Sequence, residues 1–93
     1  MGRYSIKISD KAKKELVLLH RSGDKILMKR IEKIFEELGD NPYAGTGKPE
    51  QLRYNLSGLW SRRLDRKNRI VYEVLEEIVT VFIIAAKGHY SDK

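Results

Sequence analysis

Apolar residues recur along this chain with two different spacings, and the change of spacing predicts two kinds of secondary structure. Polar and apolar residues alternate from residue 3 to residue 8, which is typical of a half-buried strand. Two stretches with apolar residues three and four positions apart follow, and they predict two amphipathic helices. The apolar stripes are Ala12, Leu16 and Leu19 in the first helix and Leu27, Ile31, Ile34, Phe35 and Leu38 in the second. The short break at residues 21–23 makes the pair an antiparallel helical hairpin.

Capping residues indicate where the two helices begin and end. Ser9 and Asp10 precede the first apolar stripe, and Ser22 and Asp24 precede the second. Their side-chain oxygens can accept hydrogen bonds from the first free N–H groups of a helix. Gly39 follows the last apolar position of the second stripe and predicts the end of that helix.

Strand-like patterns dominate the second half of the chain. A loop rich in glycine and proline spans residues 41–49, and strands are predicted at residues 60–64, 69–75 and 78–86, with a further short one around residues 51–55. Residues 78–86 are the most apolar, so we expect that strand at the centre of the sheet. The order β-α-α-β-β-β(-β) predicts an α+β fold in a single domain, residues 1–93, with two helices on one face of a mostly antiparallel sheet.

Composition restricts the function further. The chain has 19 Lys and Arg residues against 13 acidic ones, a net charge of +6, which suits a polyanionic partner. It has no cysteine, which fits a cytoplasmic protein and excludes thiolate metal sites. The two histidines stand far apart and suggest no metal ligand set, so we expect neither metal nor cofactor. No signal-peptide or membrane-spanning pattern is present.

Most of the excess positive charge lies in one stretch. Seven basic residues and two acidic ones fall between Lys48 and Arg69, and five of the seven are arginine. Arginine suits bidentate contact with phosphate. A solvated surface is the alternative interpretation of such a run. We predict RNA or phosphate binding by Lys48, Arg53, Arg62 and Arg63.

Three residues in this half of the chain could cleave RNA without a metal. Such cleavage needs a base for the ribose 2′-hydroxyl, a cation near the phosphate and an acid for the leaving oxygen. Glu50, Arg69 and His89 can fill these roles in that order. Their alternatives are a solvated loop carboxylate, a strand-end arginine in a surface ion pair and an exposed tail histidine. An imidazole titrates near pH 6.5, which suits a general acid.

Five aromatic and basic side chains accompany this set. Tyr90, next to His89, can stack on an unpaired base or pack back on the sheet edge. Arg62 and Arg63 point to opposite faces of their strand, so one of them shares the face of Arg69. Trp60 and Tyr72 are predicted to be core residues.

Several sequence blocks resemble the YoeB/Txe branch of the RelE toxin superfamily. They are Gly45-Thr46-Gly47-Lys48-Pro49-Glu50, Asn55-Leu56-Ser57-Gly58-Leu59-Trp60-Ser61-Arg62-Arg63, Arg69-Ile70-Val71-Tyr72 and His89-Tyr90. The resemblance implies a RelE-like microbial RNase fold and a toxin that cuts messenger RNA in the ribosomal A site. It implies a YefM-type antitoxin, contact with the ribosome and a homodimer.

The resemblance also implies roles residue by residue. The family's general base falls on Glu50, its phosphate-stabilising arginine on Arg69, its general acid on His89 and its terminal aromatic on Tyr90. A second arginine of the catalytic face falls on Arg63. Arg53 stands where the family often has lysine.

Two other functions fit parts of this pattern. A basic α+β domain could bind RNA or an antitoxin without cutting anything, but simple binding does not require an acid and a base together. A toxin of the same superfamily could instead act on another target, such as a topoisomerase. Mapping of cellular RNA ends distinguishes these functions, because a ribosome-dependent nuclease leaves cuts within translated frames.

Overall fold

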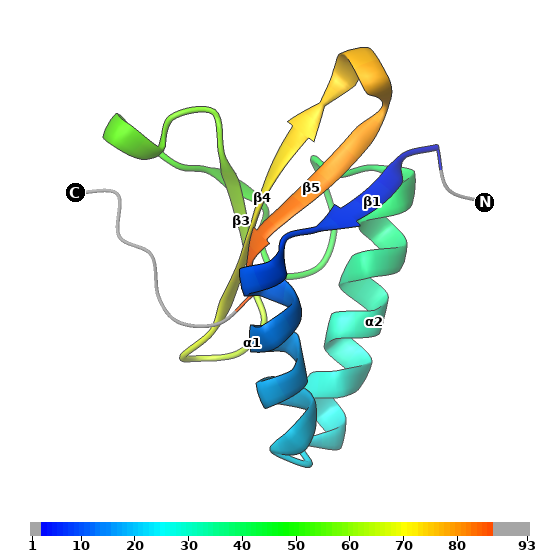
Figure 1. Ribbon diagram of the computed structural model, residues 1–93, viewed down its shortest axis with the longest axis vertical. Coiled ribbons are helices and arrows are strands. Elements are labelled where there is room, and N and C mark those ends of the chain that lie inside the picture. The colour runs from blue at the N-terminus through cyan, green and yellow to red at the C-terminus, as the bar shows by residue number, and fades with distance from the viewer. Residues whose placement is uncertain (1–2, 87–93) are drawn as a thin grey trace.

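Two helices cover one face of a five-stranded sheet (Figure 1). The computed structural model describes residues 3–86, apart from the side chain of Asn55. In chain order the elements are β1 (Ser5–Ile8), α1 (Asp10–Arg21), α2 (Lys25–Asp40), β2 (Glu50–Gln51), the 3₁₀ turn η1 (Tyr54–Leu56), β3 (Trp60–Arg63), β4 (Arg69–Leu75), the 3₁₀ turn η2 (Glu76–Ile78) and β5 (Thr80–Ala85). This order confirms the predicted α+β class.

The strands lie in the order β1-β5-β4-β3-β2. Strands β2 to β5 pair antiparallel with their neighbours, whereas β1 pairs parallel with β5, with Ser5 opposite Thr80. The sheet is therefore mixed, and the first strand of the chain lies beside the last. The central strand is β4, not the more apolar β5 that we expected there. Burial on both faces explains this position, because Ile70, Val71 and Tyr72 of β4 are all fully buried.

Both helices begin where side-chain caps are available. The Ser9 side chain accepts a hydrogen bond from the Ala12 N–H, and the Asp24 side chain accepts one from Leu27. Of the two candidate caps for α2, the structure uses Asp24. Gly39 lies inside α2, which ends one residue later at Asp40. The expected stop at Gly39 was therefore one residue early.

The main hydrophobic core lies between the helices and the sheet. Helix residues Ala12, Leu19, Leu27, Ile34 and Leu38 pack there with Leu64, Ile70, Tyr72, Val81 and Ile83, and Trp60 lies at its margin. This confirms the core positions predicted for Trp60 and Tyr72. Burial of this apolar surface is the main contribution to stability.

The 3₁₀ turns were not predicted. Residues 76–78 form η2, so β5 begins at Thr80 instead of residue 78, and η1 occupies residues assigned to a short strand. Three-residue helical turns carry no periodic apolar signal, which explains why they escaped the pattern. No helix within residues 3–86 has the length and apolar character needed to cross a membrane.

Candidate active site on the open face of the sheet

Alternation along β4 decides which side chains face the helices. Ile70 and Tyr72 belong to the core beneath the helices, so Arg69 and Val71 point to the opposite, open face. On β3 the residues opposite Val71 and Arg69 are Ser61 and Arg63. Glu50 of β2 lies opposite Ser61. Three neighbouring strands thus place polar side chains on the same face.

Glu50 and Arg69 meet on this face. Nη1 of Arg69 lies 3.2 Å from Oε1 of Glu50 and donates a hydrogen bond to it. The Glu50 side chain is 61% exposed, whereas that of Arg69 is 16% exposed. Two of the three predicted catalytic residues, nineteen positions apart in the chain, are therefore in direct contact.

Ser61 contacts the guanidinium of Arg69 at the surface of the sheet. The sequence did not identify Ser61 as a site residue. It is almost fully buried, and its Oγ accepts a hydrogen bond from Arg69 Nη1 at 3.5 Å. Side chains alternate between the two faces of a strand, so Ser61 lies on the same face as Arg63. This alternation could have identified Ser61 from the sequence. Its contact limits the positions open to the guanidinium.

Arg63 faces Arg69 directly across the β3–β4 ladder. Like charges opposite each other on adjacent strands destabilise a sheet. Within residues 3–86, no hydrogen bond or ion pair involves the Arg63 side chain. Two cations side by side, one unpaired within this range, form a site that favours an anion.

A small apolar cluster borders the polar residues. Leu52, Val71 and Ala85 are buried together on the open face, with Leu56 and Leu59 packed against them. The cluster ties the segment after β2 to the sheet, and the Leu52 N–H donates to the Leu59 carbonyl oxygen. Edge strand β2 is only two residues long, so this contact helps to hold Glu50 in place.

Arg62 lies on the other side of the sheet and requires a correction. Its side chain is fully buried, and a guanidinium in that position cannot contact RNA. It donates instead to Glu37 Oε1 (2.8 Å), to Tyr72 Oη (3.2 Å), and to the carbonyl oxygens of Asn41 (3.1 Å), Ala44 (2.8 Å) and Thr46 (3.4 Å). The prediction of phosphate binding by Arg62 is therefore wrong.

Glu37 completes the buried contacts of Arg62. Its carboxylate also accepts hydrogen bonds from the N–H (2.7 Å) and the Oγ1 (2.9 Å) of Thr46. Burial raises the pKa of Glu37, but the bonds from Thr46 and the charge of Arg62 outweigh it and leave the pKa lowered. The carboxylate thus remains charged and bonded to both the loop and β3.

The other predicted site residues divide into two groups. Lys48 and Arg53 are both exposed and stand on either side of β2. Their location allows contact with a strand of RNA, and phosphate binding by them stays a prediction. His89 and Tyr90 lie outside the described residues.

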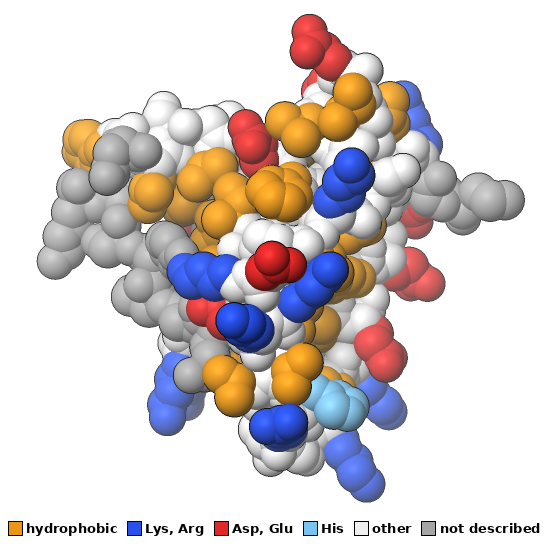
Figure 2. Space-filling model, in the orientation of Figure 1, with side chains coloured by type: hydrophobic (Ala, Val, Ile, Leu, Met, Phe, Trp, Pro, Cys, Tyr) orange, Lys and Arg blue, Asp and Glu red, His pale blue; other side chains and the backbone are white. Residues whose placement is uncertain are grey.

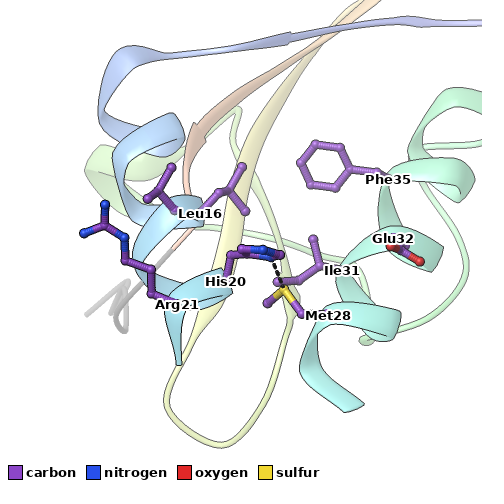
Figure 3. Close-up of a pocket in the computed structure, with 8 residues that line it drawn as sticks. Leu16, His20, Arg21, Met28, Ile31, Glu32 and Phe35 are labelled. Carbon is purple, nitrogen blue, oxygen red and sulfur yellow. Dashed lines mark hydrogen bonds between the residues drawn. The ribbon is translucent and has the colours of Figure 1, made fainter. Parts of the chain in front are cut away.

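An open groove lies elsewhere, between the two helices (Figure 3). Its volume is about 630 Å³, and the residues that line it include Leu16, His20, Met28, Ile31 and Phe35. His20 Nδ1 lies 3.3 Å from the sulfur of Met28. This apolar groove contains none of the predicted catalytic residues, so we place the candidate site on the open face of the sheet.

The open face can carry out two chemical tasks. Arg69 and Arg63 can bind a phosphate, and Glu50 can accept a proton once that phosphate takes its place beside Arg69. Exchange is feasible because exposed ion pairs contribute little free energy, about 0 to 1 kcal/mol. Within residues 3–86 no three His, Asp or Glu side chains gather closely enough to hold a metal ion.

Comparisons with known proteins match both the sequence and the fold. A family model described as a YoeB-like toxin of bacterial type II toxin–antitoxin systems matches residues 9–90. Toxin YoeB of Escherichia coli O6:H1 is 42% identical over 73 residues, which cover 78% of this chain and 84% of that toxin. A YoeB dimer from Staphylococcus aureus has a TM-score of 0.79 at 32% identity, covering 95% of this chain and 99% of that one. A YoeB–YefM complex from the same species gives 0.76 at 31% identity, with the same coverage.

Proposed function

The chain belongs to the YoeB-like toxins of bacterial type II toxin–antitoxin systems, and from this premise we propose that it is an endoribonuclease that cuts messenger RNA in the ribosomal A site. The observation that carries the proposal is the contact of Glu50 with Arg69 on a face that also presents Arg63. A carboxylate beside paired guanidinium groups offers a base next to a phosphate site.

The proposed reaction is an attack of the ribose 2′-hydroxyl on the adjacent phosphate. Glu50 takes the 2′-hydroxyl proton, and the oxygen then bonds to phosphorus. Arg69 stabilises the negative charge that develops on the phosphate, where a fixed donor is most effective. His89 protonates the leaving 5′-oxygen as its bond to phosphorus breaks. The products are a 2′,3′-cyclic phosphate and a 5′-hydroxyl end.

Substrate binding uses the side chains around this centre. Arg63 contacts the scissile phosphate, and Lys48 and Arg53 contact the backbone on either side of β2. Tyr90 stacks on an unpaired base, an interaction of about 1 to 3 kcal/mol. These assignments rest on the exposure and charge of the three basic residues and on the family resemblance of the tyrosine.

Ribosome docking is assigned to the outer surface of the helices. Lys and Arg side chains gather over α1 on the face that Figure 2 shows. Exposed cations of the two helices include Lys11, Lys13, Lys14, Lys29, Arg30 and Lys33. Such a surface attracts the phosphates of ribosomal RNA.

A YefM-type antitoxin is the proposed regulator. The YoeB–YefM complex of Staphylococcus aureus supports such a partner, and the YoeB dimer of that species supports self-association. An acidic segment of the antitoxin laid over Arg63 and Arg69 would compete with the RNA phosphate. The bound toxin is then expected to cut RNA slowly, and full-rate cutting in the complex would contradict this arrangement.

Brief induction in bacteria tests the proposed activity. Wild-type protein should arrest growth and leave new RNA ends within translated frames, whereas Glu50→Gln should do neither. Glu77→Gln, an exposed carboxylate far along the chain, serves as the matched control and should behave as wild type. Arrest without new RNA ends would indicate a toxin with another target. Absence of arrest by the wild type would indicate a binding module.

A further inference from the structure

Arg62 and Glu37 join three parts of the molecule that the sequence keeps separate. Glu37 lies on α2, Arg62 on β3, and between them runs the loop of residues 41–49 that leads directly into Glu50. The two side chains take part in seven hydrogen bonds, and five of these bonds involve this loop. We infer that Arg62 and Glu37 are positioning residues for the carboxylate of Glu50. The inference rests on the proposed role of Glu50 as the base.

The path of the loop depends largely on contacts with the rest of the protein. It contains no helix or strand, and two of its glycines have positive φ angles that other residues rarely adopt, +126° at Gly45 and +87° at Gly47. Arg62 meets the carbonyl oxygens of Asn41, Ala44 and Thr46, which are distributed along most of the loop. One planar guanidinium therefore fixes several points of a segment that has no helix or strand of its own.

Close packing of the loop against β3 fixes the position of the residues that precede Glu50. A Cβ atom on Gly47 would lie 2.6 Å from the carbonyl oxygen of Arg63, so the loop crosses β3 in direct contact. The Arg63 N–H donates to the Gly47 carbonyl oxygen at 2.8 Å. Three residues later the chain reaches Glu50, which pairs with Ser61 on the same strand. Strand β3 thus presents Ser61 and Arg63 to the substrate face and uses Arg62, between them, to hold the loop.

Tyr72 connects Arg62 to the beginning of the loop. Its hydroxyl accepts from Nε of Arg62 and donates to the carbonyl oxygen of Pro42 at 2.7 Å. Buried side-chain polar atoms within the described residues are all hydrogen-bonded. A fully satisfied buried network rigidifies its surroundings. Small displacements of a catalytic group can reduce a rate by about a hundredfold, so such rigidity has a direct kinetic value.

The test is a double-mutant cycle between Glu37 and Glu50, read in single-turnover cleavage of messenger RNA on programmed ribosomes. Glu37→Gln keeps the shape of the side chain but removes its charge. In the wild-type background we expect it to reduce the maximal rate by about ten- to a hundredfold. The concentration that gives half of the maximal rate should stay nearly unchanged. Glu36→Gln, the same change at the neighbouring exposed position of α2, is the matched control and should keep the full rate.

The background with Glu50→Gln provides the decisive comparison. Without a base to position, Glu37→Gln should reduce the residual rate by less than a factor of about two. A purely structural role would reduce the rate by the same factor in both backgrounds, and that result overturns the inference. A full rate for Glu37→Gln alone also overturns it. If Glu50→Gln itself cuts at the wild-type rate, the proposed function fails instead.

Thr46→Val gives a second, milder variant should Glu37→Gln fold poorly. It removes the bond from Oγ1 to Glu37 and retains the bond from the backbone N–H. The same pattern is expected with a smaller reduction: a slower maximal rate with Glu50 present and no change with Gln in its place. Thermal unfolding is recorded for each variant. If Thr46→Val reduces the cleavage rate by the same factor in both backgrounds, that result contradicts the positioning role.

Discussion

Arg62 and Arg63 are neighbours in the chain, yet β3 places them in opposite environments. Arg62 is fully buried, and five hydrogen-bond acceptors surround its guanidinium. Arg63 is exposed and stands opposite another arginine, Arg69. An arginine whose donors are satisfied within the protein serves the fold, whereas one held beside a like charge is available to an anionic ligand. Environment, and not residue type, therefore separates the two roles.

Replacement of the buried arginine should have the largest effect on stability. Arg62→Met leaves Glu37 without its cation and several loop carbonyl groups without donors. Loss of one partner of a buried ion pair costs about 3 to 5 kcal/mol. Urea denaturation should therefore show a sharply lower unfolding midpoint. Arg63→Met is the matched control, and a similar loss of stability in both variants would abolish the contrast between the two residues.

Removal of the arginine that contacts Glu50 should reduce activity most. Arg69→Ala deletes the donor that stabilises the developing charge, and the expected loss is about a hundred- to a thousandfold, or about 2.7 to 4 kcal/mol. The measurement is single-turnover cleavage on programmed ribosomes. Because the side chain is partly exposed, the unfolding midpoint should change far less than in Arg62→Met. Near-normal cutting would show that Arg69 does not have the proposed role.

Relief of the repulsion between the paired cations should have a small and opposite effect on stability. Arg63→Thr removes one of two like charges that face each other across β3 and β4. We expect stability to rise by about 0.2 to 1 kcal/mol, more at low salt, while RNA cleavage slows. Thermal unfolding at two salt concentrations checks the first part. If Arg63→Thr lowers stability by an amount that does not vary with salt, Arg63 and Arg69 do not repel each other in the folded protein.

Acid should remove the contribution of Glu37, the smallest effect in the series. Its pKa is lowered in the folded protein, so its stabilisation is present above its ordinary pKa near 4.5 and is lost as the pH falls through the lowered value. The gap in unfolding midpoint between the wild type and Glu37→Gln should be largest at neutral pH and narrow below pH 4.5. A gap that stays constant down to strongly acidic pH would contradict the lowered pKa.

Much of the fold could be predicted because one-dimensional patterns specify it. The bounds of β4 and the start of α1 follow directly from alternation and capping. The parallel pairing of β1 with β5 could not be deduced, because it depends on how the helical hairpin returns the chain to the sheet. The two 3₁₀ turns could not be predicted, because three residues are too few to show a helical period of apolar positions.

The site was predicted in part. Glu50 and Arg69 meet as expected, and one of the two adjacent arginines shares their face. The prediction failed for Arg62 because positive charge was taken as a sign of exposure. Alternation already placed Arg62 on the same face as Trp60, a predicted core residue, and this relation identifies the buried arginine. Three of the five acceptors around it are carbonyl oxygens of the folded loop, whose positions no spacing rule describes.

The pairing of the first strand with the last governs how this protein folds as it is synthesised. Ser5 finds its neighbour Thr80 only after most of the chain has been made, and the cap of α1 also contacts β5 through the Ile84 carbonyl oxygen. Contacts between residues so distant in sequence raise the contact order and slow folding. A nascent chain that has not yet reached residues 80–83 cannot pair β1 with the sheet. Strand β1 therefore has no pairing partner in the sheet until β5 has been synthesised, which delays completion of the toxin's fold.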